Sequence, residues 1–284
     1  MSPERPESAQ ERSSVRHLKV PGGSLAYETA GQGLPLLFIH SVIADRRMWD
    51  REFPVYSADH QTVRFDLRGF GGSSSATAPF SYGADLEALA THLHLDRPYL
   101  VGSSMGGALA IDYALAHPDR VRGLMLVAPG LSGGFEPPFD AEEAAAFAYD
   151  EAKSQEINRA WSDHDTTAAV DLLGQLWCSA LEGPNRELFH TMVRQNLPEV
   201  FDNRSMKLAT DPPPAAGRLS DIRVPTTILL GDRDNPSSAV FAKRIARSIR
   251  GSRLVAVPGG DHLVNLSAPG AFDRELRSAL SELR

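Results

Sequence analysis

Residues 101–107 have the sequence Val-Gly-Ser-Ser-Met-Gly-Gly, which places Ser104 at the centre of a Gly-x-Ser-x-Gly pattern. The pattern lies between a predicted strand, 98–101, and a predicted helix, 105–117. A sharp strand-to-helix turn needs glycine two residues on either side of the serine, because side chains there would collide with neighbouring backbone. Such a turn exposes the hydroxyl above the strand end, which predicts Ser104 as a nucleophile. The alternative is an ordinary serine in a glycine-rich turn.

A serine hydroxyl attacks well only when a neighbouring base takes its proton. Of the nine histidines, His262 is the one that follows the last predicted strand, 254–257, within the sequence Pro-Gly-Gly-Asp-His-Leu. We therefore predict His262 as the general base, with a histidine of a surface loop as the alternative. Asp261, which precedes it, is expected to be a solvent-facing turn residue.

The acid that orients this base is expected after the preceding strand, 225–230. The chain continues there as Gly-Asp-Arg-Asp-Asn-Pro, so Asp232 and Asp234 compete for the role. Asp232 stands at the immediate end of the strand, whereas Asp234 lies just before a helix that Pro236 helps to begin. At this point the residues leave the choice open.

An acyl-transfer site also needs two backbone N–H groups that bind the oxyanion. Met105, the residue after the nucleophile, supplies one of them. The second is expected from residues 40–43, His-Ser-Val-Ile, which follow the predicted strand 35–40.

Four further side chains are candidate substrate contacts. Trp161 and Trp177 are aromatic residues that could line an apolar pocket, with core packing as the alternative. Ser41, which follows the predicted strand 35–40, and Ser103, which precedes Ser104, are the other two.

Short aliphatic or β-branched runs alternate along the chain with stretches of helical periodicity, which is typical of a mostly parallel sheet covered by helices. Residues 15–20 and 24–29 are predicted to form an opening hairpin. Further strands are predicted at 35–40, 62–66, 98–101, 122–127, 225–230 and 254–257, and helices at 85–95, 105–117 and 271–283.

Strand patterns disappear between Gly130 and Pro214, where the sequence becomes helical and aromatic. A segment of this length between two strands rarely lacks structure of its own, so we predict a helical lid. The predicted organisation is a disordered N-terminal segment, 1–14, a first core part, 15–130, the lid, 131–214, and a second core part, 215–284.

A net charge of −7 argues against nucleic acid as a partner, because no basic stripe is present to neutralise phosphates. No apolar run approaches the roughly 18 residues that a membrane-spanning helix needs, so no membrane is expected as a partner. The single cysteine, Cys178, excludes an intrachain disulfide and suits a reducing cytoplasm, where we expect the protein to be located. No metal-ligand spacing appears, and neither a metal nor an organic cofactor is expected. A homo-oligomer is left open.

With these motifs the chain resembles the α/β-hydrolase superfamily from about Val15 to Leu283. The chain order of serine, acid and histidine is the order of this superfamily. The resemblance selects Asp234 as the acid and the N–H of Val42 as the second oxyanion donor. It implies an α/β-hydrolase fold, with a mostly parallel eight-stranded sheet flanked by helices and an inserted helical lid, or cap, domain.

Among its subfamilies, the closest resemblance is to 3-oxoadipate enol-lactonase-like hydrolases. It is carried by Ser41 with the following segment 45–50, Asp-Arg-Arg-Met-Trp-Asp, and by segment 262–265, His-Leu-Val-Asn. The chain departs from the pattern where Ser41 replaces glycine and where Ser267 replaces an acidic residue, which leaves the particular lactone open.

The predicted function is hydrolysis of a small carboxylic ester or lactone through a Ser-His-Asp triad and an acyl-enzyme intermediate. Its predicted partner is this small molecule. Two alternatives stay open: a carbon–carbon bond hydrolase of a diketone-type substrate, and a non-hydrolytic cyclase or binding protein with the same fold. The unusual pair His40-Ser41 keeps the non-hydrolytic alternative open.

Overall fold

The structure is a computed structural model that describes residues 14–203 and 214–283. Of the predicted disordered segment, 1–14, all but the last residue lies outside the described residues. Eight strands form one sheet. They are β1 Arg16–Val20, β2 Gly23–Ala30, β3 Pro35–Ile39, β4 Gln61–Phe65, β5 Tyr99–Ser103, β6 Gly123–Val127, β7 Thr226–Gly231 and β8 Arg253–Val257.

The order of the strands across the sheet is β1-β2-β4-β3-β5-β6-β7-β8. β2 pairs antiparallel with both β1 and β4, and all the other neighbours are parallel. β3, β5 and β6 are buried along their whole length, as their continuous apolar sequences predict. The predicted fold class, a mostly parallel eight-stranded α/β-hydrolase sheet, is confirmed.

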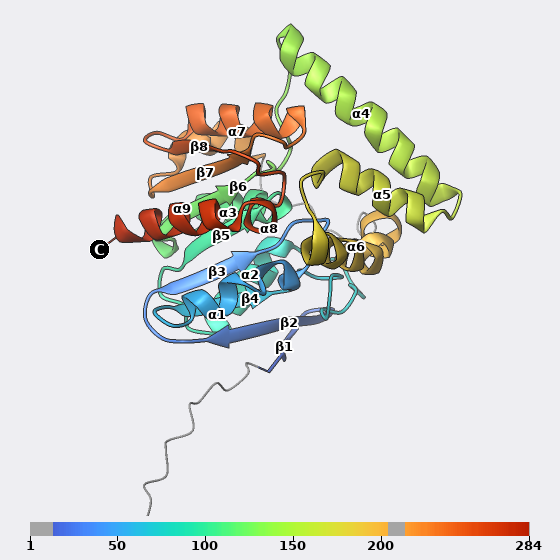
Figure 1. The fold of residues 1–284 in the computed structure, drawn as a ribbon. Coiled ribbons are helices and arrows are strands. Elements are labelled where there is room, and N and C mark those ends of the chain that lie inside the picture. The colour runs from blue at the N-terminus through green and yellow to red at the C-terminus, as the bar shows by residue number, and fades with distance from the viewer. Residues whose placement is uncertain (1–13, 204–213, 284) are drawn as a thin grey trace, which may run out of the picture.

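Helices cover both faces of the sheet (Figure 1). Because successive strand side chains point to opposite faces, the central strands β3, β5, β6 and β7 contribute to two cores. Leu37 and Leu100 belong to the core that α2, α3 and α7 complete, whereas Leu36 and Val101 belong to the core that α1, α8 and α9 complete. The bounds are α1 Glu52–Tyr56, α2 Tyr82–His92, α3 Met105–Ala116, α7 Pro236–Ser248, α8 Val264–Ser267 and α9 Pro269–Ser281, with short 3₁₀ helices η1 Arg46–Trp49, η2 Pro118–Arg120 and η5 Ala215–Asp221.

Between β6 and β7 the chain forms a run of helices, which we call the helical insert. It contains α4 Ala141–Ser162, α5 Thr166–Trp177, α6 Gly183–Pro198 and the π-helix η3 Glu199–Asn203. In Figure 1 α4, α5 and α6 lie together on the side toward which the arrow of β3 points. Residues 204–213, which belong to the predicted lid, lie outside the described residues.

Candidate active site

Ser104 lies in a sharp turn between β5 and α3. Its φ of 53° falls in the left-handed region, which is strained for a serine. A Cβ on Gly102 would lie 2.3 Å from the carbonyl oxygen of Gly106, and a Cβ on Gly106 would lie 2.4 Å from that of Ile39. Glycine is therefore required at both positions. The turn holds Ser104 half-buried at the N-terminus of α3, where the helix dipole favours negative charge.

His262 follows β8 and faces Asp234, which follows β7. The Nδ1 atom of His262 lies 3.0 Å from each carboxylate oxygen of Asp234, and both side chains are buried. A carboxylate only accepts hydrogen bonds, so Nδ1 carries the ring proton and Nε2 is the nitrogen that can accept one. The hydroxyl of Ser238 lies 3.3 Å from the same Nδ1.

Asp232, the competing aspartate, is exposed and turned elsewhere. Its Oδ1 accepts a hydrogen bond of 2.8 Å from the N–H of Gly259. β5, β7 and β8 run parallel in one sheet, so the residues that follow their carboxyl ends meet at the same edge. Ser104, Asp234 and His262 are these residues.

The pKa of His262 lies above its ordinary value of 6.5. Burial by itself lowers this pKa, but the charge and hydrogen bond of Asp234, together with the charges of Asp261 and Asp150, outweigh the effect of burial. The imidazolium that forms when the ring takes up a proton is therefore stabilised by its surroundings.

Asp261 is fully buried, so the expectation of a solvent-facing turn residue is wrong. Its carboxylate accepts hydrogen bonds from the N–H groups of Leu263, at 3.0 Å, and Ala180, at 3.1 Å. The second bond joins the His262 loop to the chain between α5 and α6, and this long-range contact has no local signal in the sequence. Burial raises the pKa of Asp261.

The loop after β3 carries the predicted oxyanion donor Val42. The N–H of Leu67 donates to Nε2 of His40 at 2.9 Å, so the ring proton is on Nδ1, which donates to the carbonyl of Ser41 at 2.8 Å. Burial lowers the pKa of His40 and keeps the ring neutral. Ser41 is itself fully buried. The unusual His-Ser pair is thus part of a buried network that fixes the backbone next to Val42.

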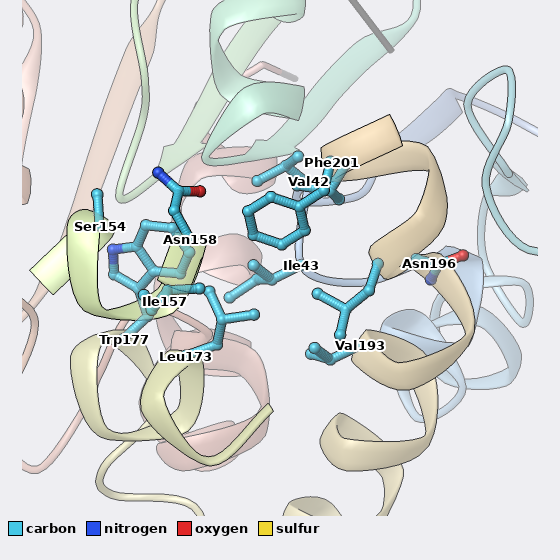
Figure 2. Close-up of a pocket in the computed structure, with 12 residues that line it drawn as sticks. Val42, Ile43, Ser154, Ile157, Asn158, Leu173, Trp177, Val193, Asn196 and Phe201 are labelled. Atoms are coloured by element: carbon cyan, nitrogen blue, oxygen red, sulfur yellow. The ribbon is translucent and has the colours of Figure 1, made fainter. Parts of the chain in front are cut away.

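A cavity of about 220 Å³ lies between this loop and the helical insert (Figure 2). It is lined by Val42, Ile43, Ser154, Ile157, Asn158, Leu173, Trp177, Val193, Asn196, Leu197, Val200 and Phe201. None of these described lining residues carries a charge. Ile157, Leu173, Val193 and Leu197 are buried and make an apolar inner wall, whereas Asn158 is exposed at the rim.

Asn196 is the buried polar residue of this lining, and its side chain is committed to protein partners. Its Oδ1 accepts from the N–H of Gly71 at 3.0 Å, and its Nδ2 lies 3.3 Å from the carbonyl oxygen of Ala44 and 3.0 Å from a carboxylate oxygen of Asp45. The interior of the cavity is therefore apolar in its chemistry.

Trp177 connects the cavity to the histidine. Its indole, which lines the cavity, stacks on the ring of His262 with the centroids 5.8 Å apart and the planes at 26°. The N–H of His262 also donates to the carbonyl of Trp177 at 3.0 Å. Trp177 thus contacts both the cavity and the predicted base, whereas the described lining itself includes neither His262 nor Ser104.

The other predicted substrate contacts lie outside the lining. Trp161 stacks on the ring of Phe201, with centroids 5.4 Å apart, and its Nε1 donates to Asp202 at 2.9 Å. Ser41 and Ser103 are fully buried at the ends of β3 and β5.

Two groups near His262 were missed by sequence reasoning. Ser237 and Ser238 lie in the first turn of α7, where Asn235 and Pro236 are a recognisable helix start and could have indicated them. Asp150 of α4 accepts a hydrogen bond from the hydroxyl of Ser237. Nothing in the local sequence of α4 distinguishes Asp150 from its acidic neighbours.

Within the described ranges, no group of three or more histidine, cysteine, aspartate or glutamate side chains is placed to hold a metal ion. None of the described helices is long and apolar enough to cross a membrane.

Comparison with known proteins identifies the family. The profile of the alpha/beta hydrolase family matches residues 36–275. The chain is 29% identical over 271 residues to the pimeloyl-[acyl-carrier protein] methyl ester esterase of Chromobacterium violaceum, which covers 90% of this chain and 98% of that relative. It is also similar to the crystal structure of a hydrolase from Pseudomonas aeruginosa PA01, with 27% identity, a TM-score of 0.72 and coverage of 96% and 99% of the two chains. A thermophilic esterase from Thermogutta terrifontis has the same fold, with 24% identity, a TM-score of 0.73 and coverage of 95% and 97%. The chain belongs to the alpha/beta hydrolase family, and it is a hydrolase.

Proposed function

We propose that the protein hydrolyses a small, neutral carboxylic ester or lactone through Ser104, His262 and Asp234. The observation that carries the proposal is the contact of His262 Nδ1 with both carboxylate oxygens of Asp234. It leaves Nε2 as the proton acceptor at the sheet edge where the strained turn holds Ser104.

In the first step, His262 takes the proton from the Ser104 hydroxyl as that oxygen attacks the carbonyl carbon. The N–H groups of Met105 and Val42 bind the oxyanion of the tetrahedral intermediate. His262 then donates its proton to the leaving alcohol as the carbon–oxygen bond breaks. Water then attacks the acyl carbon and gives a proton to His262. The bond between that carbon and Oγ of Ser104 breaks, His262 returns the proton to Oγ, and the acid is released.

Trp177, which lines the cavity and stacks on His262, supports the cavity as the site of a short and uncharged substrate group. Its volume of about 220 Å³ is below the roughly 300–1,000 Å³ of common ligand sites. A carboxylate on the inner wall would lose its hydration without gaining a charged partner. The cavity thus favours a neutral aliphatic group over a carboxylate-bearing enol-lactone. The Chromobacterium violaceum relative is named as a methyl ester esterase, which supports an ester as the cleaved bond.

The test compares methyl pentanoate with monomethyl succinate, which is of similar size but ends in a carboxylate. We expect wild type to hydrolyse methyl pentanoate, and Ser104→Ala to lose at least about a thousandfold in kcat. Monomethyl succinate should be slower by about a hundredfold in kcat/KM, because its charge must be desolvated.

Each outcome bears on a different part of the proposal. An active Ser104→Ala variant contradicts Ser104 as the nucleophile. Equal rates on the two esters contradict the preference for a neutral substrate but not the role of Ser104 as the nucleophile. A wild-type protein that hydrolyses neither ester contradicts ester hydrolysis and returns the question to carbon–carbon bond cleavage and to non-hydrolytic binding.

A further inference from the structure

Asp150 is half-buried on α4 of the helical insert. Its Oδ2 accepts a hydrogen bond from the hydroxyl of Ser237, in the first turn of α7. Its Oδ1 is buried and has no hydrogen-bond partner in the described part of the chain. A buried polar atom without a partner costs free energy, so such atoms in a native fold call for an explanation.

The turn that Asp150 contacts also carries the acid end of the triad. The N–H of Asn235 donates to Oδ1 of Asp234 at 2.7 Å. Oδ1 of Asn235 accepts from the N–H of Ser238 at 2.9 Å and lies 3.0 Å from the hydroxyl of Ser237. The hydroxyl of Ser238 then lies 3.3 Å from Nδ1 of His262. Asp150 of the insert is therefore bonded, through Ser237, to the turn whose residues Asp234 and Ser238 both contact His262.

A second contact keeps α4 beside α7. Glu143 lies seven residues before Asp150, which is about 10 Å along the helix and close to two full turns. Its carboxylate accepts from Nε of Arg244 at 2.7 Å. The face of α4 that carries Asp150 is thus joined to α7 at two points.

The charges of three carboxyl groups act on the imidazole of His262: Asp234 from the β7–α7 turn, Asp261 from its own loop and Asp150 from α4. The pKa of the Asp150 carboxyl is raised by burial and by the charge of Asp234. That of Asp261 is raised by burial. Trp177, the ring stacked on the imidazole, is uncharged.

We propose that Asp150 is a positioning residue of the active site. Through Ser237 it fixes the turn that holds Asp234 and Ser238 against His262, and its carboxylate adds a negative charge beside the imidazole. The proposal rests on the proposed hydrolysis by Ser104. It makes α4 of the insert a part of the catalytic site, because a displacement of α4 from α7 removes both the hydrogen bond and the charge.

The test pairs Asp150→Asn with Glu151→Gln, which removes the same charge from the next position of α4. Glu151 is exposed and accepts from Nε2 of Gln155. The titration of His262 is followed by NMR of its ring protons in the Ser104→Ala background, with the signals assigned by their loss in His262→Gln. The asparagine still accepts a hydrogen bond from Ser237, so we expect the pKa of His262 to fall in Asp150→Asn and to stay at the wild-type value in Glu151→Gln.

The kinetic readout uses the same two variants with Ser104 intact. The acid limb of kcat/KM should move to lower pH in Asp150→Asn only, and kcat on the plateau should fall by about three- to tenfold because the imidazolium loses one flanking charge. Ser237→Ala keeps the charge and loses the hydrogen bond, so it should lower kcat several-fold with little change in KM.

An unchanged titration of His262 in Asp150→Asn overturns the proposal. Should that variant fail to fold, Ser237→Ala decides: wild-type kcat and a wild-type titration of His262 would overturn it as well. The NMR titration needs no turnover. If the wild-type enzyme is inactive but the pKa of His262 falls in Asp150→Asn, the proposed hydrolysis is contradicted, whereas the placement of Asp150 beside His262 is still supported.

Discussion

Replacing Asp234 with asparagine keeps the shape of the side chain and removes its charge. The carboxylate oxygens lie 3.0 Å from Nδ1 of His262 in a buried contact. At about 4 Å between the charge centres and an effective dielectric constant of about 20, such a pair is worth about 4 kcal/mol. This stabilisation exists only while His262 is protonated, as it is in the transition state, so its loss corresponds to about a thousandfold in kcat.

The amide adds a second effect in the same direction. If its NH₂ group donates to Nδ1, the ring proton of His262 moves to Nε2, and Nε2, the proposed acceptor of the Ser104 proton, can no longer accept one. A change of tautomer of this kind brings the total loss to about 10³–10⁴ in kcat.

Asp232→Asn is the matched control, since Asp232 is exposed and bonded to the N–H of Gly259. We expect it to retain kcat within about twofold, as most surface substitutions have small effects. Initial rates on methyl pentanoate, measured at about pH 8, on the alkaline side of the ordinary histidine range, give both losses relative to the Ser104→Ala background. A loss of less than about tenfold in Asp234→Asn, or an equal loss in Asp232→Asn, would refute the assignment of the acid.

Two further predictions concern pH. The charge of Asp234 outweighs the effect of burial and raises the pKa of His262. The value of kcat/KM of wild type should therefore rise with pH through a midpoint above 6.5. A midpoint below 6.5 in the measured pH–rate profile would contradict a raised pKa of His262. Burial raises the pKa of Glu52 from an ordinary 4.5 to about 7, so the folded state holds a proton that the unfolded state releases, and stability should fall by about 3 kcal/mol as pH rises through this window. Glu52→Gln should abolish this fall, which urea unfolding of both proteins at about pH 5 and pH 8 measures; an equal fall in the variant would show that another group is responsible.

The sequence alone was sufficient to predict the sheet, the turn at Ser104 and the position of His262 after the last strand. Each rests on a local property of the chain. A strand buried on both faces needs a continuous apolar run, as in 35–39 and 99–103, and the turn needs glycine where a Cβ would meet backbone. The chain order of these elements then determines which loops reach the same edge of a parallel sheet.

The tertiary structure decided what depends on packing between distant segments. It showed that Asp234, which the family resemblance selects, contacts His262 and that Asp232 does not, because the directions of the two side chains depend on how the turn packs against the His262 loop. It buried Asp261 against the insert and placed Asp150 at the first turn of α7. It also showed which apolar residues of the insert line the cavity, because in the sequence the same residues are equally compatible with packing in the core. Propensity and periodicity describe a residue and its near neighbours in the chain, whereas these contacts exist only once the insert has packed onto the sheet.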